Sequence, residues 1–397
     1  MNSFASFDHY HTPLGPDGTP YAYYEALRDE ALANGQPIGR SEAHGGFWVV
    51  VGWEESKAIQ DNQRDFSNVA VTFPQYATPT GKPFFLSGQD EPEHTKYRRM
   101  VQAPFTRPRA QKMLGQMREI GHMLVDDVIG QERFDACIAT DRMPGYAFCA
   151  IMGLSMDHEP QYRRFVNAMV TGATDPEGAA PVIREMGQYW LDLIHERRAR
   201  PSDGLVDEII AAELDGERLS DDELLEFCTV LLLGGFDNTL RFLGNVFYRL
   251  SWDRELRRRL VARPALIPKA VDEFLRLDAP ASTFRLVRND VTVAGVAMKA
   301  GDIAGLIHPV CNRDPRQFEH PDAFLLGRKT NHRHMTFGSG VHHCLGAFLA
   351  HAEAVAMIEA LLERIPEFTL DPAAPARWVV GQVGGMVEVP VLVPHAR

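Results

Sequence analysis

The sequence has no apolar run long enough to cross a bilayer. Its longest strongly apolar stretch is Val230–Leu233, whereas a spanning helix needs about 20 such residues. Residues 1–18 are polar and rich in histidine, proline and glycine, and they resemble neither a signal peptide nor a membrane anchor. We therefore expect a soluble, cytoplasmic protein that has no membrane partner.

Cysteines and basic residues are both scarce. The five cysteines form no CxxC pair and no CxxCH sequence, which argues against a disulfide framework and against covalently attached haem. There are 41 lysines and arginines against 53 aspartates and glutamates, so the net charge at pH 7 is −12. This balance argues against nucleic-acid binding as the main activity.

Linkers, internal repeats and low-complexity tracts are also missing. At 397 residues and 45% hydrophobic content, the chain can bury a substantial core. Helical patterns dominate, with strands predicted at 38–41 and 47–51 and a loop between two helices predicted at 175–178. We predict one domain over residues 1–397, mainly α with small β-sheets (α+β), in which a helix-rich core carries a β-rich N-terminal subregion.

What the sequence does contain is one cysteine in a glycine-rich loop, Phe337-Gly338-Ser339-Gly340-Val341-His342-His343-Cys344-Leu345-Gly346. Glycines let a backbone turn tightly and approach a bulky group. The apolar helix predicted over 345–365 places Cys344 before a helix N-terminus, which stabilises a thiolate, and a thiolate is a strongly donating ligand for haem iron. This loop resembles the cysteine loop of cytochromes P450.

The resemblance implies the cytochrome P450 fold, in which a long central helix lies over a thiolate-bound haem b. It implies a haem-thiolate monooxygenase that uses O2 and two electrons to hydroxylate a small hydrophobic substrate. Cys344 would be the metal ligand, and Phe337 and His342 would contact the cofactor. Since the sequence contains no recognisable reductase domain, the resemblance implies a monomer served by a separate ferredoxin or flavodoxin.

Two further segments match haem-binding residues of the family. His94 and Arg98 lie four residues apart on one face of a predicted helix, and Arg285 follows in a predicted strand. All three would neutralise haem propionates. The basic residues near this helix form a candidate docking face for an acidic electron carrier, with scattered surface charge as a strong alternative; they are Lys96, Arg99, Arg107, Arg109 and Lys112.

A second informative element begins at the capping box 220–223, and no proline follows until Pro264. The helix predicted here is roughly twice the ordinary length, and its middle reads Gly234-Gly235-Phe236-Asp237-Asn238-Thr239. Interior glycines cost about 1 kcal/mol each, so they indicate a notch. The notch serves either tight helix packing or, with Gly235 against a haem, the approach of O2 and substrate.

This helix resembles the oxygen-binding helix of cytochromes P450, in which an acid precedes a threonine. Asp237 matches the acid, Asn238 replaces the threonine, and Thr239 follows; all three are candidate catalytic residues for proton delivery. With asparagine at this place, the helix is similar to that of the cineole-hydroxylating bacterial cytochrome P450 (P450cin). In that enzyme the asparagine is associated with holding the ether oxygen of the substrate. The similarity extends to His9–Gly18, Val71–Pro74 and Gly381–Val383.

Glu273 and Arg276 lie one turn apart in a helix predicted over 267–277. An exposed pair of this kind contributes little to stability. Here it matches the structural Glu-x-x-Arg of the family, with Arg328 as a candidate third member.

The stretch 66–89 is dense in proline, glycine and aromatic residues, and long loops of this kind commonly cover binding sites. In the family it faces the substrate. We expect a mostly apolar pocket, lined by Thr72, Phe73, Tyr76, Phe236, Asn238, Leu240, Phe284 and Val383.

Several functions stay open at this point. The resemblance favours an oxygenated monoterpene such as 1,8-cineole as substrate, whereas the rings of Phe236 and Phe284 favour an aromatic ether that is O-demethylated. A peroxygenase that uses hydrogen peroxide, or a haem-based sensor, would also need Cys344. A zinc site at residues 342–344 fits poorly, because adjacent ligands suit a tetrahedron badly.

Overall fold

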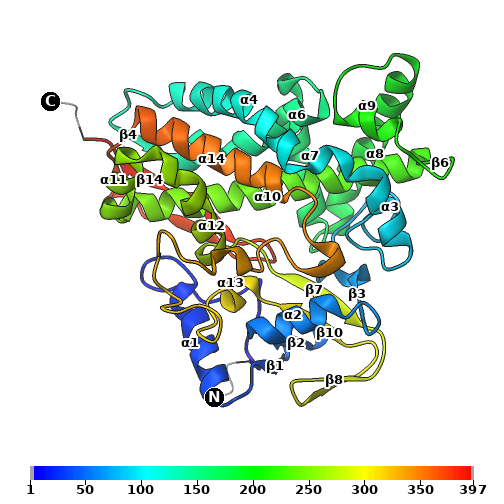
Figure 1. The fold of residues 1–397 in the computed structure, drawn as a ribbon, viewed down its shortest axis with the longest axis horizontal. Helices are drawn as coiled ribbons and strands as arrows, with labels where there is room; N and C mark the ends of the chain where they lie inside the picture. Colours follow the sequence, from blue (N-terminus) through cyan, green and yellow to red (C-terminus); the bar gives the residue numbers. More distant parts are fainter. Residues whose placement is uncertain (1–3, 395–397) are drawn as a thin grey trace.

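The computed structural model describes residues 4–394 and is mainly helical (Figure 1). The longer helices are α1 Tyr21–Ala33, α2 Trp53–Asp61, α3 Glu93–Val101, α4 Arg107–Asp126, α6 Met143–Met152, α7 Glu159–Thr171, α8 Pro176–Ala199, α10 Asp221–Trp252, α11 Arg254–Ala262, α12 Ile267–Leu277 and α14 Ala347–Arg364. The shorter ones are α5 Ala136–Asp141, α9 Leu205–Ile210 and α13 His308–Cys311.

The strands are short, and most belong to small sheets. The largest sheet has the order β1-β2-β10-β7-β3 and consists of β1 Ile38–Ser41, β2 Phe47–Val50, β3 Phe66–Ser67, β7 Thr283–Val287 and β10 Ile303–Leu306. Its β2–β10 pair is parallel and its other pairs are antiparallel. The remaining strands are β4 Arg133–Asp135, β5 Glu213–Leu214, β6 Glu217–Arg218, β8 Val291–Val293, β9 Val296–Met298, β11 Thr369–Leu370, β12 Arg377–Val379, β13 Gly385–Glu388 and β14 Pro390–Leu392.

The mainly α class with small sheets is therefore confirmed. The five-stranded sheet joins the N-terminal strands β1, β2 and β3 to β7 and β10, which come from residues 283–306, so blue and yellow ribbons lie together in Figure 1. The β-rich region thus also draws on the second half of the chain. The single domain over residues 1–397 stays a prediction.

The central helix α10 begins where the capping box predicts. The Ser220 hydroxyl accepts a hydrogen bond from the Glu223 backbone N–H (3.3 Å), and the Glu223 carboxylate accepts one from the Ser220 N–H (2.7 Å). These bonds satisfy donors that a helix N-terminus leaves free. The helix then runs for 32 residues through the main hydrophobic core, where it contacts α5, α6, α7, α8 and β13.

Two predicted boundaries are wrong. The stretch 175–178 is not a loop, because Asp175 caps α8: its carboxylate accepts a hydrogen bond from the Gly178 N–H at 3.0 Å, so the helix begins at Pro176. The helix behind the cysteine begins at Ala347 instead of residue 345, since Gly346 has a non-helical backbone. That helix, α14, packs along α4. Among residues 4–394, none of the helices has the length and apolar character that a membrane span requires.

Candidate active site

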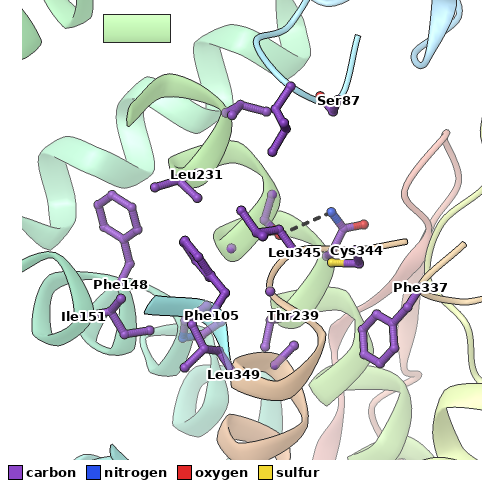
Figure 2. Close-up of a pocket in the computed structure, with 18 of the residues that line it drawn as sticks. Ser87, Phe105, Phe148, Ile151, Leu231, Thr239, Phe337, Cys344, Leu345 and Leu349 are labelled. Carbon is purple, nitrogen blue, oxygen red and sulfur yellow. Dashed lines mark hydrogen bonds between the residues drawn. The ribbon is translucent and has the colours of Figure 1, made fainter. Parts of the chain in front are cut away.

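A cavity of about 320 Å³ lies between α10, α14 and the cysteine loop, which we define as residues 337–346. Its wall is mostly apolar, and Figure 2 shows side chains from several elements around it. From α10 come Phe227, Val230, Leu231, Gly234, Gly235, Asn238, Thr239 and Phe242. Other parts of the wall are Phe85, Leu86, Ser87, Phe105, Phe148, Ile151, Leu345 and Leu349.

Cys344 lies on this wall, with its surface open to the cavity inside the protein. Its backbone N–H donates to the Phe337 carbonyl at 2.8 Å, which closes the loop. Gly338 and Gly340 have φ of 70° and 68°, a conformation that favours glycine. Burial raises the pKa of the Cys344 thiol, while the Gly346 N–H and the Arg98 charge lower it. A coordinated metal ion would hold such a thiol deprotonated.

His94, Arg98 and His342 form a basic end of the cavity. The rings of His94 and His342 lie 3.9 Å apart between centroids, and Nε2 of each is buried without a hydrogen-bond partner. Burial lowers the pKa of both histidines, to about 2 for His342, and the positive charge of Arg98 adds to this. Buried nitrogens without partners are costly, so this end of the cavity suits an anionic ligand.

Arg285 lies beside this basic end but is not part of the cavity wall. Its Nη1 donates to the Thr283 hydroxyl (3.0 Å) and the Phe284 carbonyl (2.7 Å), whereas its Nε is buried without a partner. Burial lowers the pKa of Arg285 to about 10. Nearby His308, which no sequence pattern indicated, is buried in α13 with an unpartnered Nε2. A lone histidine in an apolar stretch gives no signal in a single sequence.

The glycines of α10 open the helix toward the cavity. A Cβ added at Gly234 or Gly235 would meet no atom within 4 Å, so tight helix packing does not explain them. Asn238 and Thr239 lie on the same wall. The Asn238 amide donates a long bond to the Gly234 carbonyl at 3.5 Å, which leaves it available for a better partner.

Asp237 is turned away from this wall. It is buried and absent from the cavity lining, and its carboxylate lies 3.5 Å from Nε of Arg241. Burial raises the pKa of Asp237, against the attraction of Arg241, which lowers it. The structure thus brings Asn238 and Thr239 together at the cavity, whereas Asp237 faces the neighbouring side of the helix.

Most of the residues predicted to contact the substrate do not line the cavity. Of the eight, the structure places Asn238 alone on the cavity wall. Phe73 and Phe284 belong to an aromatic cluster on the five-stranded sheet, with ring centroids 5.7 Å apart. Phe236 is buried beneath the Arg163 guanidinium (5.3 Å). The other four also lie outside the lining: Thr72, Tyr76, Leu240 and Val383.

The loop 66–89 does reach the cavity, but through residues 85–87. Thr72 and Tyr76 instead fix the fold of the loop, because the Thr72 hydroxyl accepts a hydrogen bond from the Tyr76 N–H at 3.1 Å. Val383 pairs with Ala281 in an isolated β-bridge. The stretch 66–89 thus contributes residues 85–87 to the cavity wall, and these differ from the residues predicted within it.

Behind the cysteine loop, Glu273 and Arg276 form a buried ion pair at 2.8 Å. Arg328 also donates to the Glu273 carboxylate at 2.9 Å, so the structure brings all three predicted partners together. The Thr336 hydroxyl, which lines the cavity, donates to the Leu275 carbonyl at 2.6 Å. Because Thr336 directly precedes the cysteine loop, this bond holds the start of the loop against α12.

Comparison with known proteins decides the family. A family model described as "Cytochrome P450" matches residues 179–374. The chain is 33% identical to mycinamicin IV hydroxylase/epoxidase of Micromonospora griseorubida over 383 residues, which cover 93% of this chain and 94% of that protein. The chain belongs to the cytochrome P450 family. A second relative, pentalenic acid synthase of Streptomyces avermitilis, is 31% identical to this cytochrome P450 over 94% of each chain.

A solved structure agrees with this assignment. Cytochrome P450 PksS of Bacillus subtilis superimposes with a TM-score of 0.86 at 27% identity, over 98% of this chain and 99% of that one. Cytochromes P450 are haem-dependent monooxygenases that bind haem b and use O2, so the predicted fold, enzyme class and cofactor are confirmed. The thiol on the cavity wall, the unpartnered histidine nitrogens and the open notch of α10 are features that suit this group.

Proposed function

We propose that this cytochrome P450 hydroxylates compact hydrophobic molecules that carry one oxygen atom, with an oxygenated monoterpene such as 1,8-cineole as the first candidate. The observation that carries the proposal is the position of Asn238 in an otherwise largely apolar wall. An amide both donates and accepts hydrogen bonds, and a polar group in an apolar pocket sets the orientation of the ligand. Such a wall favours a hydrocarbon skeleton with one hydrogen-bonding oxygen.

In this proposal Cys344 is the iron ligand, and His94, Arg98, Arg285 and His342 hold the propionates. The unpartnered nitrogens of His94, Arg285 and His342 support the assignment, because propionate oxygens would supply the missing acceptors. Phe337 and Gly235 line the cavity and would contact the porphyrin. When bound, haem supplies the iron at which O2 is activated for insertion of one oxygen atom into a C–H bond.

Residues of α10 would hold water and transfer protons. Asn238 and Thr239 would hold water in the notch by hydrogen bonds from the amide and the hydroxyl. Burial raises the pKa of Asp237, which favours uptake of a proton, and rotation of its side chain from Arg241 toward the notch would deliver that proton. These three roles are proposals that rest on adjacency along α10.

A separate ferredoxin or flavodoxin would supply the electrons to a cytoplasmic monomer. Two of the five basic residues in the candidate docking face already have acidic partners: Lys96 is paired with Glu217 and Arg109 with Glu208. The other three are exposed; they are Arg99, Arg107 and Lys112. Arg107 lies over the ring of Phe348, which is itself 41% exposed, so this face combines positive charge with an apolar contact.

A second substrate class is favoured by the aromatic wall. The rings of Phe85, Phe105, Phe148, Phe227 and Phe242 line the cavity and would stack against a flat ligand. O-demethylation of a small aromatic ether is therefore the alternative.

Spectral titration of the haem-loaded protein tests these substrates. If the proposal is right, 1,8-cineole shifts the iron from low to high spin at lower concentration than a methoxyarene does. Turnover with a ferredoxin or flavodoxin and its reductase then yields a hydroxylated product. A spin shift and demethylation with the methoxyarene alone would replace the proposal by its alternative. Turnover with hydrogen peroxide that exceeds reductase-driven turnover would instead indicate a peroxygenase.

A further inference from the structure

Three side chains that commonly bind metal ions meet outside the active-site cavity. One carboxylate oxygen of Asp8 and one ring nitrogen from each of His9 and His44 lie within 4.8 Å of one another. Asp8 and His9 belong to the N-terminal segment, whereas His44 lies in the turn between β1 and β2. None of the three lines the active-site cavity, so the mechanism leaves the cluster unexplained.

His9 is the most informative member of the cluster. Its side chain is only 3% exposed. Its Nε2 lies 2.7 Å from the Phe73 carbonyl, to which it donates, and its Nδ1 is buried with no hydrogen-bond partner. A carbonyl that holds one ring N–H fixes the tautomer whose other nitrogen carries a free lone pair, as in metal-binding histidines. Without a ligand, this buried nitrogen costs stability.

Asp8 and His44 are already held together. Nε2 of His44 lies 2.9 Å from Oδ1 of Asp8, which also accepts a bond from the Tyr10 N–H at 2.8 Å. The second oxygen of Asp8 bonds to His11 Nδ1 at 2.8 Å. His44 has φ of 53°, a backbone conformation that residues other than glycine seldom adopt. The carboxylate is thus oriented from outside the cluster, as second-shell partners orient metal ligands.

We propose that Asp8, His9 and His44 bind one divalent transition-metal ion of the Zn²⁺ class, with solvent completing its coordination. Two imidazole nitrogens and one carboxylate oxygen suit such an ion, whereas Mg²⁺ and Ca²⁺ prefer sites made of oxygen. Tetrahedral Zn²⁺ holds its ligand atoms about 3.3 Å apart. Atoms that lie within 4.8 Å of one another reach this spacing by small side-chain rotations.

The ion would clamp three segments that are far apart in the sequence. It joins the N-terminal segment to the β1–β2 turn, and the bond from His9 to the Phe73 carbonyl extends this connection to the loop 66–89. That loop carries residues 85–87 of the cavity wall. Because the ion binds the folded chain, it should raise the melting temperature in proportion to the logarithm of its free concentration.

Equilibrium dialysis of the haem-loaded, untagged protein against Zn²⁺ tests the site, with bound zinc measured by mass spectrometry. We expect one tight Zn²⁺ per chain that equal concentrations of Mg²⁺ or Ca²⁺ do not displace. His44→Asn should weaken this binding by roughly tenfold or more, the loss that even an outer-shell partner causes. Asparagine tolerates the left-handed backbone at this position, so the variant should fold; an unchanged haem spectrum checks that it does.

A matched control exists elsewhere on the surface. His195 bonds to Asp221 at 2.8 Å through Nε2, as His44 does to Asp8, but within residues 4–394 this pair is not part of any three-residue metal cluster. His195→Asn should keep the affinity and the zinc-dependent rise in melting temperature. Asp8→Asn should lose both. Equal zinc binding by the wild type and by both cluster variants would overturn the proposal, as would the absence of a tight site in the wild type.

Discussion

Arg276 donates two hydrogen bonds to the Glu273 carboxylate, at 2.8 and 2.9 Å, and both side chains are fully buried. Arg276 also donates to three backbone carbonyls of the segment 312–323, and Arg328 donates to the same carboxylate. Both charged groups are therefore extensively hydrogen-bonded, which is the condition under which a buried ion pair is tolerated. This network fixes α12, to which the cysteine loop is tied.

Glu273→Gln should therefore destabilise the protein strongly. The change leaves two arginines without their carboxylate, and breaking a buried pair in this way costs about 3–5 kcal/mol. Urea unfolding of the haem-loaded protein measures the loss. Glu388→Gln is the control, because its pair with Arg377 is exposed (57% and 46%) and should contribute less than about 1 kcal/mol. Equal losses for the two variants would contradict a structural role of Glu273.

Arg98→Leu should accelerate haem loss. Arg98 lines the cavity at its basic end, and a hydrogen bond to a charged group contributes about 1.5–3 kcal/mol. Transfer of haem to an excess of apomyoglobin should therefore be roughly ten- to hundredfold faster than in the wild type. The adjacent Arg99 is exposed, so Arg99→Leu removes the same charge without touching the cavity. If both variants release haem at the same rate, Arg98 does not hold a propionate.

Asn238→Leu should weaken binding of oxygenated substrates selectively. Leucine has a similar volume but cannot donate a hydrogen bond, and one such bond contributes about 0.5–1.5 kcal/mol. The dissociation constant of 1,8-cineole should rise roughly two- to tenfold, as measured by the spin shift. A carbocyclic analogue without the ether oxygen should bind both proteins equally. Equal weakening for the two ligands would show that Asn238 only shapes the pocket.

The segments proposed to hold or support the haem could be located from the sequence because each is local. The cysteine loop, the His94–Arg98 helix and the pair Glu273–Arg276 each lie within one loop or one helical turn. Spacing therefore places each group on one helix face or in one loop, whereas the roles predicted for these residues rest on the resemblance to the cytochrome P450 family. The start of α10 could be predicted for the same reason, since its capping box involves only residues 220–223.

The pocket residues were harder, and part of the error was avoidable. Successive residues of an α-helix are rotated by about 100°, so Gly234, Asn238 and Thr239 share a face. Phe236 and Leu240 lie on the opposite face and could have been rejected from periodicity. Counting back from Gly234 on the same face would have found Phe227, Val230 and Leu231. Residues from other elements, such as Phe148 of α6, become neighbours only through packing that a single sequence does not specify.

The protonation of Glu353 in α14 can be tested without measuring activity. It lines the cavity, its side chain is buried, and its Oε2 has no hydrogen-bond partner. Burial raises the pKa of Glu353 well above its usual range, so the folded state keeps a proton that the unfolded chain releases. Below about pH 4 both states hold this proton and the group contributes nothing to the pH dependence. Above that pH, the free energy of unfolding should fall by about 1.4 kcal/mol per pH unit until the folded pKa is reached.

Glu353→Gln should remove this decline, because a neutral amide releases no proton in either state. The free energy of unfolding of the variant, relative to the wild type, should therefore rise between about pH 5 and pH 7. All other groups titrate alike in the two proteins, so subtracting one free energy of unfolding from the other at each pH removes their contribution. Glu363→Gln, at a 68%-exposed position of the same helix, controls for the lost charge and should show no such rise. A difference between Glu353→Gln and wild type that stays constant with pH would mean that Glu353 is ionised in the folded enzyme, with a cation or water that satisfies it.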